Sequence, residues 1–284
     1  MPRSTALATA LSAVAFGLTS WADPSPAPPQ PPPYVPPKPI GAGPGVAEGM
    51  PPLPFPSVPS RRQAERQTPE AVTLVTKLKS SDPEDWARTP NDAPALLELL
   101  RKESGVAFTS DAKSIDEIAP DPAARPMLYR SGFKPFKLTE SEVAKLREYC
   151  TRGGTIVFNS LAGSPAAYDA AKQAAGQIFP GKPAQRLPNS HAIFRNYYPI
   201  EKVQFRERAL RDNVASDGMP YFDGVDVGDR TAIIISRWDL SLGWEGNPND
   251  SWGYVDEDSS KLGINILAYV LGMRAPAQDR TIRE

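Results

Sequence analysis

The chain has one cysteine and one histidine among its 284 residues. A single cysteine, Cys150, cannot form a disulfide within the chain. Zinc sites of the usual Cys/His kind need more ligands than Cys150 and His191 together provide. A serine–histidine catalytic pair would have to use His191 and no other histidine. We therefore expect no metal and no cofactor.

An excess of one charge is also missing. The chain carries 32 basic and 33 acidic residues, which gives a formal net charge of −1. Nucleic-acid-binding proteins usually carry a clustered basic excess. The balance therefore argues against a nucleic-acid partner.

Long apolar runs are scarce, and the clearest one stands at the N-terminus. Residues 4–22, STALATALSAVAFGLTSWA, follow the basic start MPR and have about the size of a signal-peptide core. Ser20 and Ala22 place small residues at positions −3 and −1 of a cleavage site, and the run is short for a bilayer span. We expect residues 1–22 to be a cleaved signal peptide, with an uncleaved anchor as the alternative. The mature protein should then work in the periplasm or outside a bacterial cell.

Proline, in contrast, is abundant, and sixteen of the 33 prolines lie in residues 23–60. Proline fixes φ and lacks the backbone N–H that helices and sheets require. Residues 23–67 are therefore expected to be a disordered, extended linker. A stalk is the simpler role, and a ligand for a proline-reading domain is the alternative. One ordered domain should span residues 68–275, followed by a flexible tail at 276–284.

The ordered part alternates between apolar runs and segments with helical spacing. Strands are expected at residues 71–79, 106–111, 126–132 and 155–159, helices at 92–103, 139–152, 166–179 and 259–272, and a hairpin at 219–239 that turns at Gly228 and Asp229. Residues 180–215 look irregular. This alternation predicts a three-layer α/β domain whose mostly parallel sheet has helices on both faces.

Three local sequence features support the expected helices. Asp92 is a plausible N-cap, and Thr139 with Glu142 has the spacing of a capping box. Cys150 recurs at helical spacing with Val143 and Leu146, so we expect it to face the core as a small apolar residue rather than to act as a reactive thiol.

In open α/β sheets, ligands bind outside the carboxyl ends of the strands. Tryptophans and a few polar groups gather at those ends here, which is typical of a small-molecule crevice. The alternative is that the tryptophans cover the sheet ends and that Asp239 caps a turn or pairs with an arginine. The expected ligand-binding residues are Trp86, Arg88, Ser131, Asn159, Ser160, Arg237, Trp238, Asp239 and Trp244.

The stretch GGTIVFNSLAGSP, residues 153–165, raises the question of a nucleophile. Ser160 stands on a strand-to-helix turn, but Phe158 and Ala162 occupy the places of the two glycines in the G-x-S-x-G motif. A Ser160–His191 pair is a minor hypothesis because a serine nucleophile needs a base within about 3 Å. A carboxylate pair of Asp239 and Glu245 is a weaker one.

Four blocks support a family resemblance: YRSGFKPFKLTESEVAKLREYCTRGGTIVFNS, FPGKPAQRLPNSHAIFRNYY, RWDLSLGWEG and LGINILAYVLG. In order and spacing they resemble the bacterial domain of unknown function 4159 over about residues 68–273. The resemblance implies a flavodoxin-like fold related to class I glutamine amidotransferase-like and trehalose-utilisation-like proteins, without an established reaction. Members often carry TGH near Arg130–Phe133 and an aspartate at Asn159, so a histidine and a carboxylate of the family pattern are missing here.

From these features we expect an exported module, without catalytic activity, that binds a small ligand or a partner protein in the cell envelope. A hydrolase or glutamine amidotransferase-like enzyme of unknown substrate is the alternative. A purely structural scaffold, with the crevice filled by its own side chains, is a third reading.

Overall fold

The most apolar strand of the sheet, at residues 230–236, is buried along almost its whole length. The computed structural model describes residues 72–213, 217–247, 249 and 251–273. The expected signal peptide (1–22), linker (23–67) and tail (276–284) lie outside the described residues, as do residues 68–71. The fold below therefore concerns the α/β domain alone.

Seven strands form one sheet in the order β2-β1-β3-β4-β7-β6-β5. The first five strands of that order run parallel, whereas β6 is antiparallel to both β7 and β5. The strands are Thr73–Leu78 (β1), Thr109–Lys113 (β2), Met127–Gly132 (β3), Thr155–Ser160 (β4), Gln185–Arg186 (β5), Phe222–Val227 (β6) and Arg230–Ser236 (β7).

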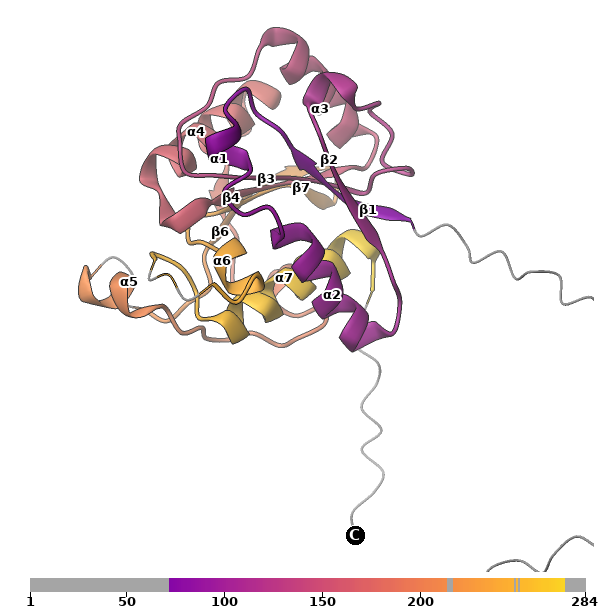
Figure 1. Ribbon diagram of the computed structural model, residues 1–284. Coiled ribbons are helices and arrows are strands. Elements are labelled where there is room, and N and C mark those ends of the chain that lie inside the picture. The colour runs from indigo at the N-terminus through magenta and orange to yellow at the C-terminus, as the bar shows by residue number, and fades with distance from the viewer. Residues whose placement is uncertain (1–71, 214–216, 248, 250, 274–284) are drawn as a thin grey trace, which may run out of the picture. The chain divides into compact units, whose positions relative to one another are not determined.

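Helices cover both faces of this sheet, with α3 and α4 on one side and α2, α6 and α7 on the other (Figure 1). The α-helices are Pro83–Trp86 (α1), Asp92–Ser104 (α2), Glu140–Thr151 (α3), Pro165–Ile178 (α4), Glu207–Arg211 (α5), Ser241–Trp244 (α6) and Asp256–Leu271 (α7). Three short 3-10 helices complete the chain, at Ile115–Glu117 (η1), Leu161–Gly163 (η2) and Ala192–Phe194 (η3).

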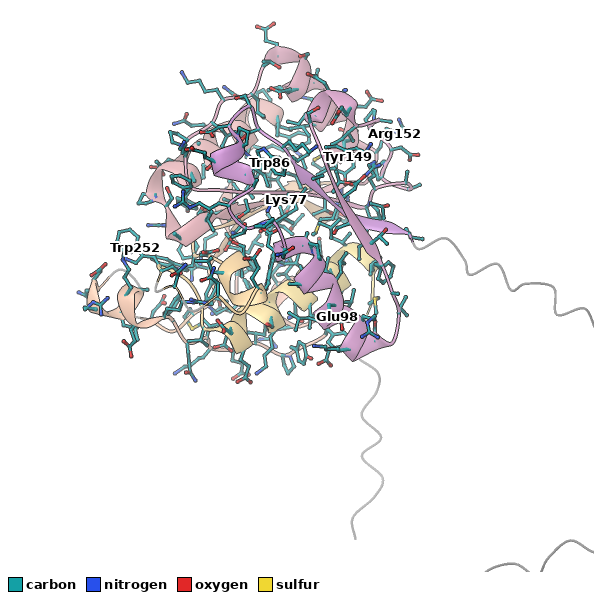
Figure 2. All side chains as sticks on the ribbon, in the orientation of Figure 1. Lys77, Trp86, Glu98, Tyr149, Arg152 and Trp252 are labelled. Atoms are coloured by element: carbon teal, nitrogen blue, oxygen red, sulfur yellow. The ribbon has the colours of Figure 1, made fainter. Side chains whose placement is uncertain are left out.

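Two apolar cores result, because side chains alternate between the faces of a strand. In β7, Ile233 and Ile235 pack under α3 and α4, whereas Ile234 packs on the opposite side. Figure 2 shows side chains filling the space between the sheet and the helices on both sides. A sheet buried on both faces requires near-continuous apolar strands, as seen here.

The expected three-layer α/β fold with a mostly parallel sheet is confirmed. The hairpin turns at Gly228, whose φ of 63° suits glycine. Thr139 and Glu142 form the capping box of α3, and Cys150 is fully buried. Burial raises the pKa of the Cys150 thiol to about 12, so it stays protonated and unreactive at neutral pH.

Some local expectations were wrong. Asn91 rather than Asp92 is the N-cap of α2, because the Asp92 carboxylate turns inward and binds Lys77. The second strand begins at Thr109, which pairs with Thr73 of β1, and not at residue 106. The segment 180–215 contains β5 and α5 as well as irregular chain.

The last helix starts at Asp256, three residues before its expected start, with an acidic first turn that suits a helix N-terminus. Within the described ranges, no helix is both long and apolar enough to cross a membrane.

Candidate functional site

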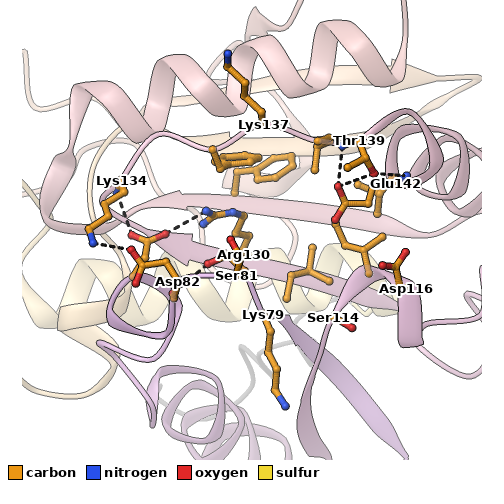
Figure 3. A pocket seen from close by; sticks show the side chains of 18 of the residues that line it. Lys79, Ser81, Asp82, Ser114, Asp116, Arg130, Lys134, Lys137, Thr139 and Glu142 are labelled. Carbon is orange, nitrogen blue, oxygen red and sulfur yellow. Dashed lines mark hydrogen bonds and ion pairs between the residues drawn. The ribbon is translucent and has the colours of Figure 1, made fainter.

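A pocket of about 610 Å³ opens at the carboxyl end of the sheet, on the side of α3 (Figure 3). The chain leaves β1 through α1 and α2 and leaves β3 through α3, and α2 and α3 lie on opposite faces of the sheet. Such a reversal between neighbouring strands creates the crevice where doubly wound sheets bind ligands. We call this cavity the switch-point pocket. Its volume lies within the range of small-molecule sites.

Apolar side chains line the inner part of the switch-point pocket. They come from β1 and β4, from η1, from the segment between β3 and α3, and from α3 itself. Phe136 stacks on Phe158 with ring centroids 5.7 Å apart, and these two rings extend the apolar surface toward β3. The apolar lining consists of Leu78, Ile115, Phe136, Leu138, Leu146 and Phe158. A ligand body with aliphatic or aromatic character fits such a wall.

Arg130 is the one cation that β3 places in the wall of this pocket. Only 7% of Arg130 is exposed. Its guanidinium donates to Asp85 Oδ2 at 3.1 Å and lies 3.9 Å above the centroid of the Phe136 ring. Burial lowers the pKa of Arg130, and the Asp85 carboxylate opposes that shift. An arginine stays charged in proteins, so a positive charge faces the pocket.

Asp85 holds this arginine from α1. Its Oδ1 accepts the backbone N–H groups of Phe133 and Lys134 at 2.8 and 2.9 Å, which leaves Oδ2 for Arg130. Gly132 makes the approach possible, since a Cβ there would overlap with the Asp85 carboxylate and lie 2.6 Å from Arg130 Nη1. Asp85 thereby connects α1, which follows β1, to β3 and to the turn after β3.

The pocket rim carries opposite charges that neutralise each other. Lys134 Nζ lies 2.6 Å from Asp82 Oδ2, and this hydrogen bond lowers the pKa of Asp82 and raises that of Lys134. Glu142 accepts the backbone N–H of Thr139 at 2.7 Å as part of the capping box. Among the cations that line the pocket, Arg130 is buried, whereas Lys79 and Lys137 are exposed and Lys134 is paired with Asp82.

Ser131 and Asn159, two of the expected binding residues, point to the opposite side of the sheet. Asn159 Nδ2 donates to Ser131 Oγ at 3.0 Å, to Asp239 Oδ1 at 3.1 Å and to Ser241 Oγ at 3.0 Å. These four side chains are buried and form a polar network under α6. The network lies apart from the switch-point pocket because neighbouring strand residues face opposite sides.

Asp239 is the centre of that network. It is 1% exposed, and burial raises its pKa, against the hydrogen bonds from Asn159, Ala162 and Ser241 that lower it. Its Oδ2 accepts the Ala162 N–H at 2.8 Å and its Oδ1 accepts the Ser241 N–H at 2.9 Å. With its oxygens occupied, Asp239 serves the fold in this structure. Glu245, its suggested carboxylate partner, accepts the N–H of Asn91 instead.

The expected crevice walled by three tryptophans does not form in the described part of the chain. Trp238 packs edge-on against Phe205 at 5.7 Å in the core, and Trp244 is also buried and donates its indole N–H to Ser259 O. Trp86 is half-buried, with the Lys79 ammonium 5.6 Å above its ring. Trp238 and Trp244 therefore bury their large apolar surface in the core, as is common for tryptophan.

The two remaining arginines of the expected set contact aromatic rings. Arg88 is exposed and lies 5.0 Å from the Phe133 ring. Arg237 is half-buried, donates to Gly163 O at 2.7 Å and lies 4.6 Å from the Trp238 ring. The structure does not bring these two arginines into the lining of the switch-point pocket.

The Ser160–His191 pair is excluded by geometry. Ser160 Oγ donates to Ser236 O at the end of β7, whereas His191 Nε2 binds Thr231 Oγ1 near its start. The two anchor points are five residue steps apart along β7, which is about 16 Å at about 3.3 Å per step. The two side chains lie toward opposite ends of the same strand, so the serine has no imidazole base.

His191 itself is a structural residue with one favoured protonation state. Thr231 Oγ1 donates to Asp226 and can accept the His191 Nε2–H, while Nδ1 accepts the N–H of Ile193 at 3.2 Å. Protonating Nδ1 would break that bond. Burial accordingly lowers the pKa of His191 below its ordinary 6.5, against an opposing effect of Asp226.

We expect the single imidazole signal in an NMR titration to have its midpoint below pH 6.5. Because the unfolded chain then binds the proton more readily, the contribution of His191 to stability is present above pH 6.5 and is lost as the pH falls through the lowered pKa. The variant His191→Gln should lack this contribution to the pH dependence of unfolding. A midpoint at or above 6.5 would contradict the burial argument.

Sequence reasoning missed the most informative residues of the switch-point pocket. Arg130 interrupts the apolar strand MLYRSG, and this interruption was the available signal. Asp85 follows the first strand in the sequence but was not among the expected binding residues, and nothing in the sequence indicated the role of Phe136. In the described ranges no group of three or more His, Cys, Asp or Glu side chains could hold a metal ion.

Two solved structures resemble the chain, both described as ThuA-like proteins. The one from Bacteroides uniformis shows 12% identity and a TM-score of 0.34, over 71% of this chain and 91% of its own. The one from Parabacteroides merdae shows 10% identity and a TM-score of 0.35, over 74% and 94%. No curated protein matches the chain.

The family assignment rests on a broader match along the sequence. The family described as "Domain of unknown function (DUF4159)" matches residues 74–271, which is well over half of the chain. These residues run from the second residue of β1 to the end of α7, so they contain the described sheet apart from Thr73, together with the switch-point pocket. The chain therefore belongs to the DUF4159 family.

Proposed function

We propose that this domain binds a small organic molecule in the switch-point pocket and does so without catalysing a reaction. The observation that carries the proposal is the buried, charged Arg130 beside the apolar side chains of a pocket at the carboxyl end of the sheet, whose remaining lining is polar. A concave, mostly apolar cavity with one or two polar groups is the usual form of a small-molecule site.

The alternative of a hydrolase or amidotransferase-like enzyme has less support. Ser160 lacks a base, Cys150 is buried with a raised pKa, and Asp239 is enclosed in a hydrogen-bonded network. A nucleophile needs both access and activation. None of these three groups combines the two, so binding is the function that the geometry favours.

A pocket-blocking variant tests this proposal. Ser81 is exposed on the rim of the pocket, so Ser81→Trp should fold and fill the entrance. Binding is measured by saturation-transfer NMR with six probes: benzoate, benzyl alcohol, benzylamine, hexanoate, hexanol and hexylamine. We expect at least one probe to bind the unmodified chain and to lose most of its signal with Ser81→Trp.

The matched control is Ser190→Trp, an equally exposed serine outside the pocket lining. It should leave binding unchanged. If no probe binds, or if both variants reduce binding equally, the proposal of a ligand site in this pocket is wrong.

We further propose that the module works in the bacterial cell envelope. The support is the basic start, apolar core and small residues before Asp23 in the sequence. N-terminal sequencing of protein from the envelope fraction should then read Asp23 first. An intact Met1 on protein in the cytoplasmic fraction would contradict this location.

A further inference from the structure

We infer that the ligand of the switch-point pocket carries a single carboxylate, which Arg130 binds, on an aliphatic or aromatic body. This inference rests on the proposed binding function and narrows it to one class of molecule. Three observations carry it: the unused donors of Arg130, the charges around it, and the rings that hold it.

Arg130 has more hydrogen-bond donors than the protein uses. A guanidinium has five N–H groups, and the described residues provide one acceptor for them, Asp85 Oδ2. Ser251 Oγ is the one buried polar side-chain atom without a partner in the described ranges. The Nε and Nη1 atoms of Arg130 also have no partner, but they are not among the fully buried atoms of this kind, so they keep some access to solvent. Arg130 lines the pocket, so that access is through the pocket. An acceptor from a ligand would satisfy them.

The surrounding charges favour one negative charge over two. Asp85 already offsets part of the charge of Arg130 at 3.1 Å. Asp116 and Glu142 also line the pocket. Of the three lysines in the lining, Lys134 is held by Asp82, and the ammonium groups of Lys79 and Lys137 point away from Arg130 (Figure 3). A dianionic phosphate would face repulsion from these carboxylates, most strongly from the buried Asp85. A carboxylate brings one charge and matches the planar fork of arginine.

Phe136 prepares the guanidinium for this contact. The ring covers one face of Arg130 at 3.9 Å and is itself stacked on Phe158. A cation–π contact of this kind fixes the plane of the guanidinium and leaves its edge for in-plane acceptors. The apolar side chains Leu78, Ile115 and Leu146 continue the wall and can cover the body of the ligand. Little rearrangement is then needed on binding.

The first experiment compares head groups on one body with the unmodified chain. Benzoate, benzyl alcohol and benzylamine have the same ring and differ in charge, and hexanoate, hexanol and hexylamine repeat the series on an alkyl chain. We expect each carboxylate to bind at least about tenfold more tightly than its alcohol and amine, a factor that one charge-assisted hydrogen bond can supply. Titration calorimetry or ligand-detected NMR measures the three affinities.

The outcomes separate this inference from the proposed function. Equal binding of acid and alcohol in the pocket, or preference for the amine, would overturn the carboxylate inference while leaving a ligand site in place. Failure of all six probes to bind would overturn both. This comparison needs no substitution, so it stands even where a variant does not fold.

The second experiment changes the arginine. Arg130→Gln removes the positive charge. Arg130→Lys keeps the charge but lacks the planar pair of N–H donors that a carboxylate can accept from. Asp85 retains its two backbone donors in both variants. We expect benzoate affinity to fall about tenfold or more in Arg130→Gln and to recover only partly in Arg130→Lys, with benzyl alcohol nearly unchanged. Arg152→Gln, at an exposed arginine paired with Glu148, is the control. Unchanged benzoate affinity in a folded Arg130→Gln would overturn the assignment of Arg130.

Discussion

Replacing Lys77 by methionine is expected to lower the free energy of unfolding by about 3–5 kcal/mol, the cost of leaving a buried charge without its partner. Lys77 Nζ lies 2.7 Å from Asp92 Oδ1, and the two side chains are 4% and 0% exposed. Asp92 Oδ2 also accepts from Thr89 and Tyr129. Lys77 lies between the sheet and α2, as Figure 2 shows. Urea-induced unfolding of the described domain measures the effect.

The exposed pair Arg101–Glu98 on the same helix provides the control. Its side chains are 52% and 46% exposed, so Arg101→Met should leave the free energy of unfolding nearly unchanged. The double variant Lys77→Met with Asp92→Leu should lose less stability than the sum of the two single variants, because an apolar pair leaves no uncompensated charge. Equal costs for Lys77→Met and Arg101→Met would refute the argument.

Removing the Asp239 carboxylate should cost a similar amount, about 3–5 kcal/mol for Asp239→Ala, because several buried donors lose their acceptor together. The substitution leaves the donors of Asn159, Ala162 and Ser241 without their acceptor in a site that water does not reach. Buried donors without a partner cost about 1–3 kcal/mol each. Asp169→Ala, at an exposed aspartate of α4, should change stability by no more than about 0.5 kcal/mol.

The pH dependence gives this prediction a second measurement. Burial raises the pKa of Asp239 above its value of 3.8 in the unfolded chain. The native state then binds more protons in the window above pH 3.8, so the contribution of Asp239 to stability falls as the pH rises toward the raised pKa. The difference in unfolding free energy between the unmodified chain and Asp239→Asn should therefore be larger near pH 4 than at neutral pH. A difference that grows with pH would show that the shift has the opposite sign.

Local signals identified much of the fold in advance. The apolar run of β7, the glycine at the hairpin turn and the capping box at Thr139 each act over a few neighbouring residues, and each was found where the sequence places it. The limits of the elements were less certain. β2 is an edge strand with mostly polar residues, so its position depends on its pairing with β1 rather than on its own composition.

The candidate site was located only in part. The switch-point pocket lies at the carboxyl end of the sheet, where the sequence predicts a site, but Ser131 and Asn159 belong to a buried network and Trp238 and Trp244 belong to the core. A strand that is apolar on both faces carries no mark of which side each residue takes. The sequence shows that successive side chains of a strand alternate between the two faces of the sheet, but it does not show which face the first side chain takes.

The sequence by itself determined the order and kind of the main elements, the parallel core of the sheet and the inward orientation of Cys150, since these follow from local spacing and apolar content. The tertiary structure alone decided that Arg130 meets Asp85, 45 residues earlier in the chain, and that Ser160 and His191 are far apart. The reason is physical. Strand order and crossover side bring distant segments together, and these depend on how whole elements pack rather than on the residues next to each site.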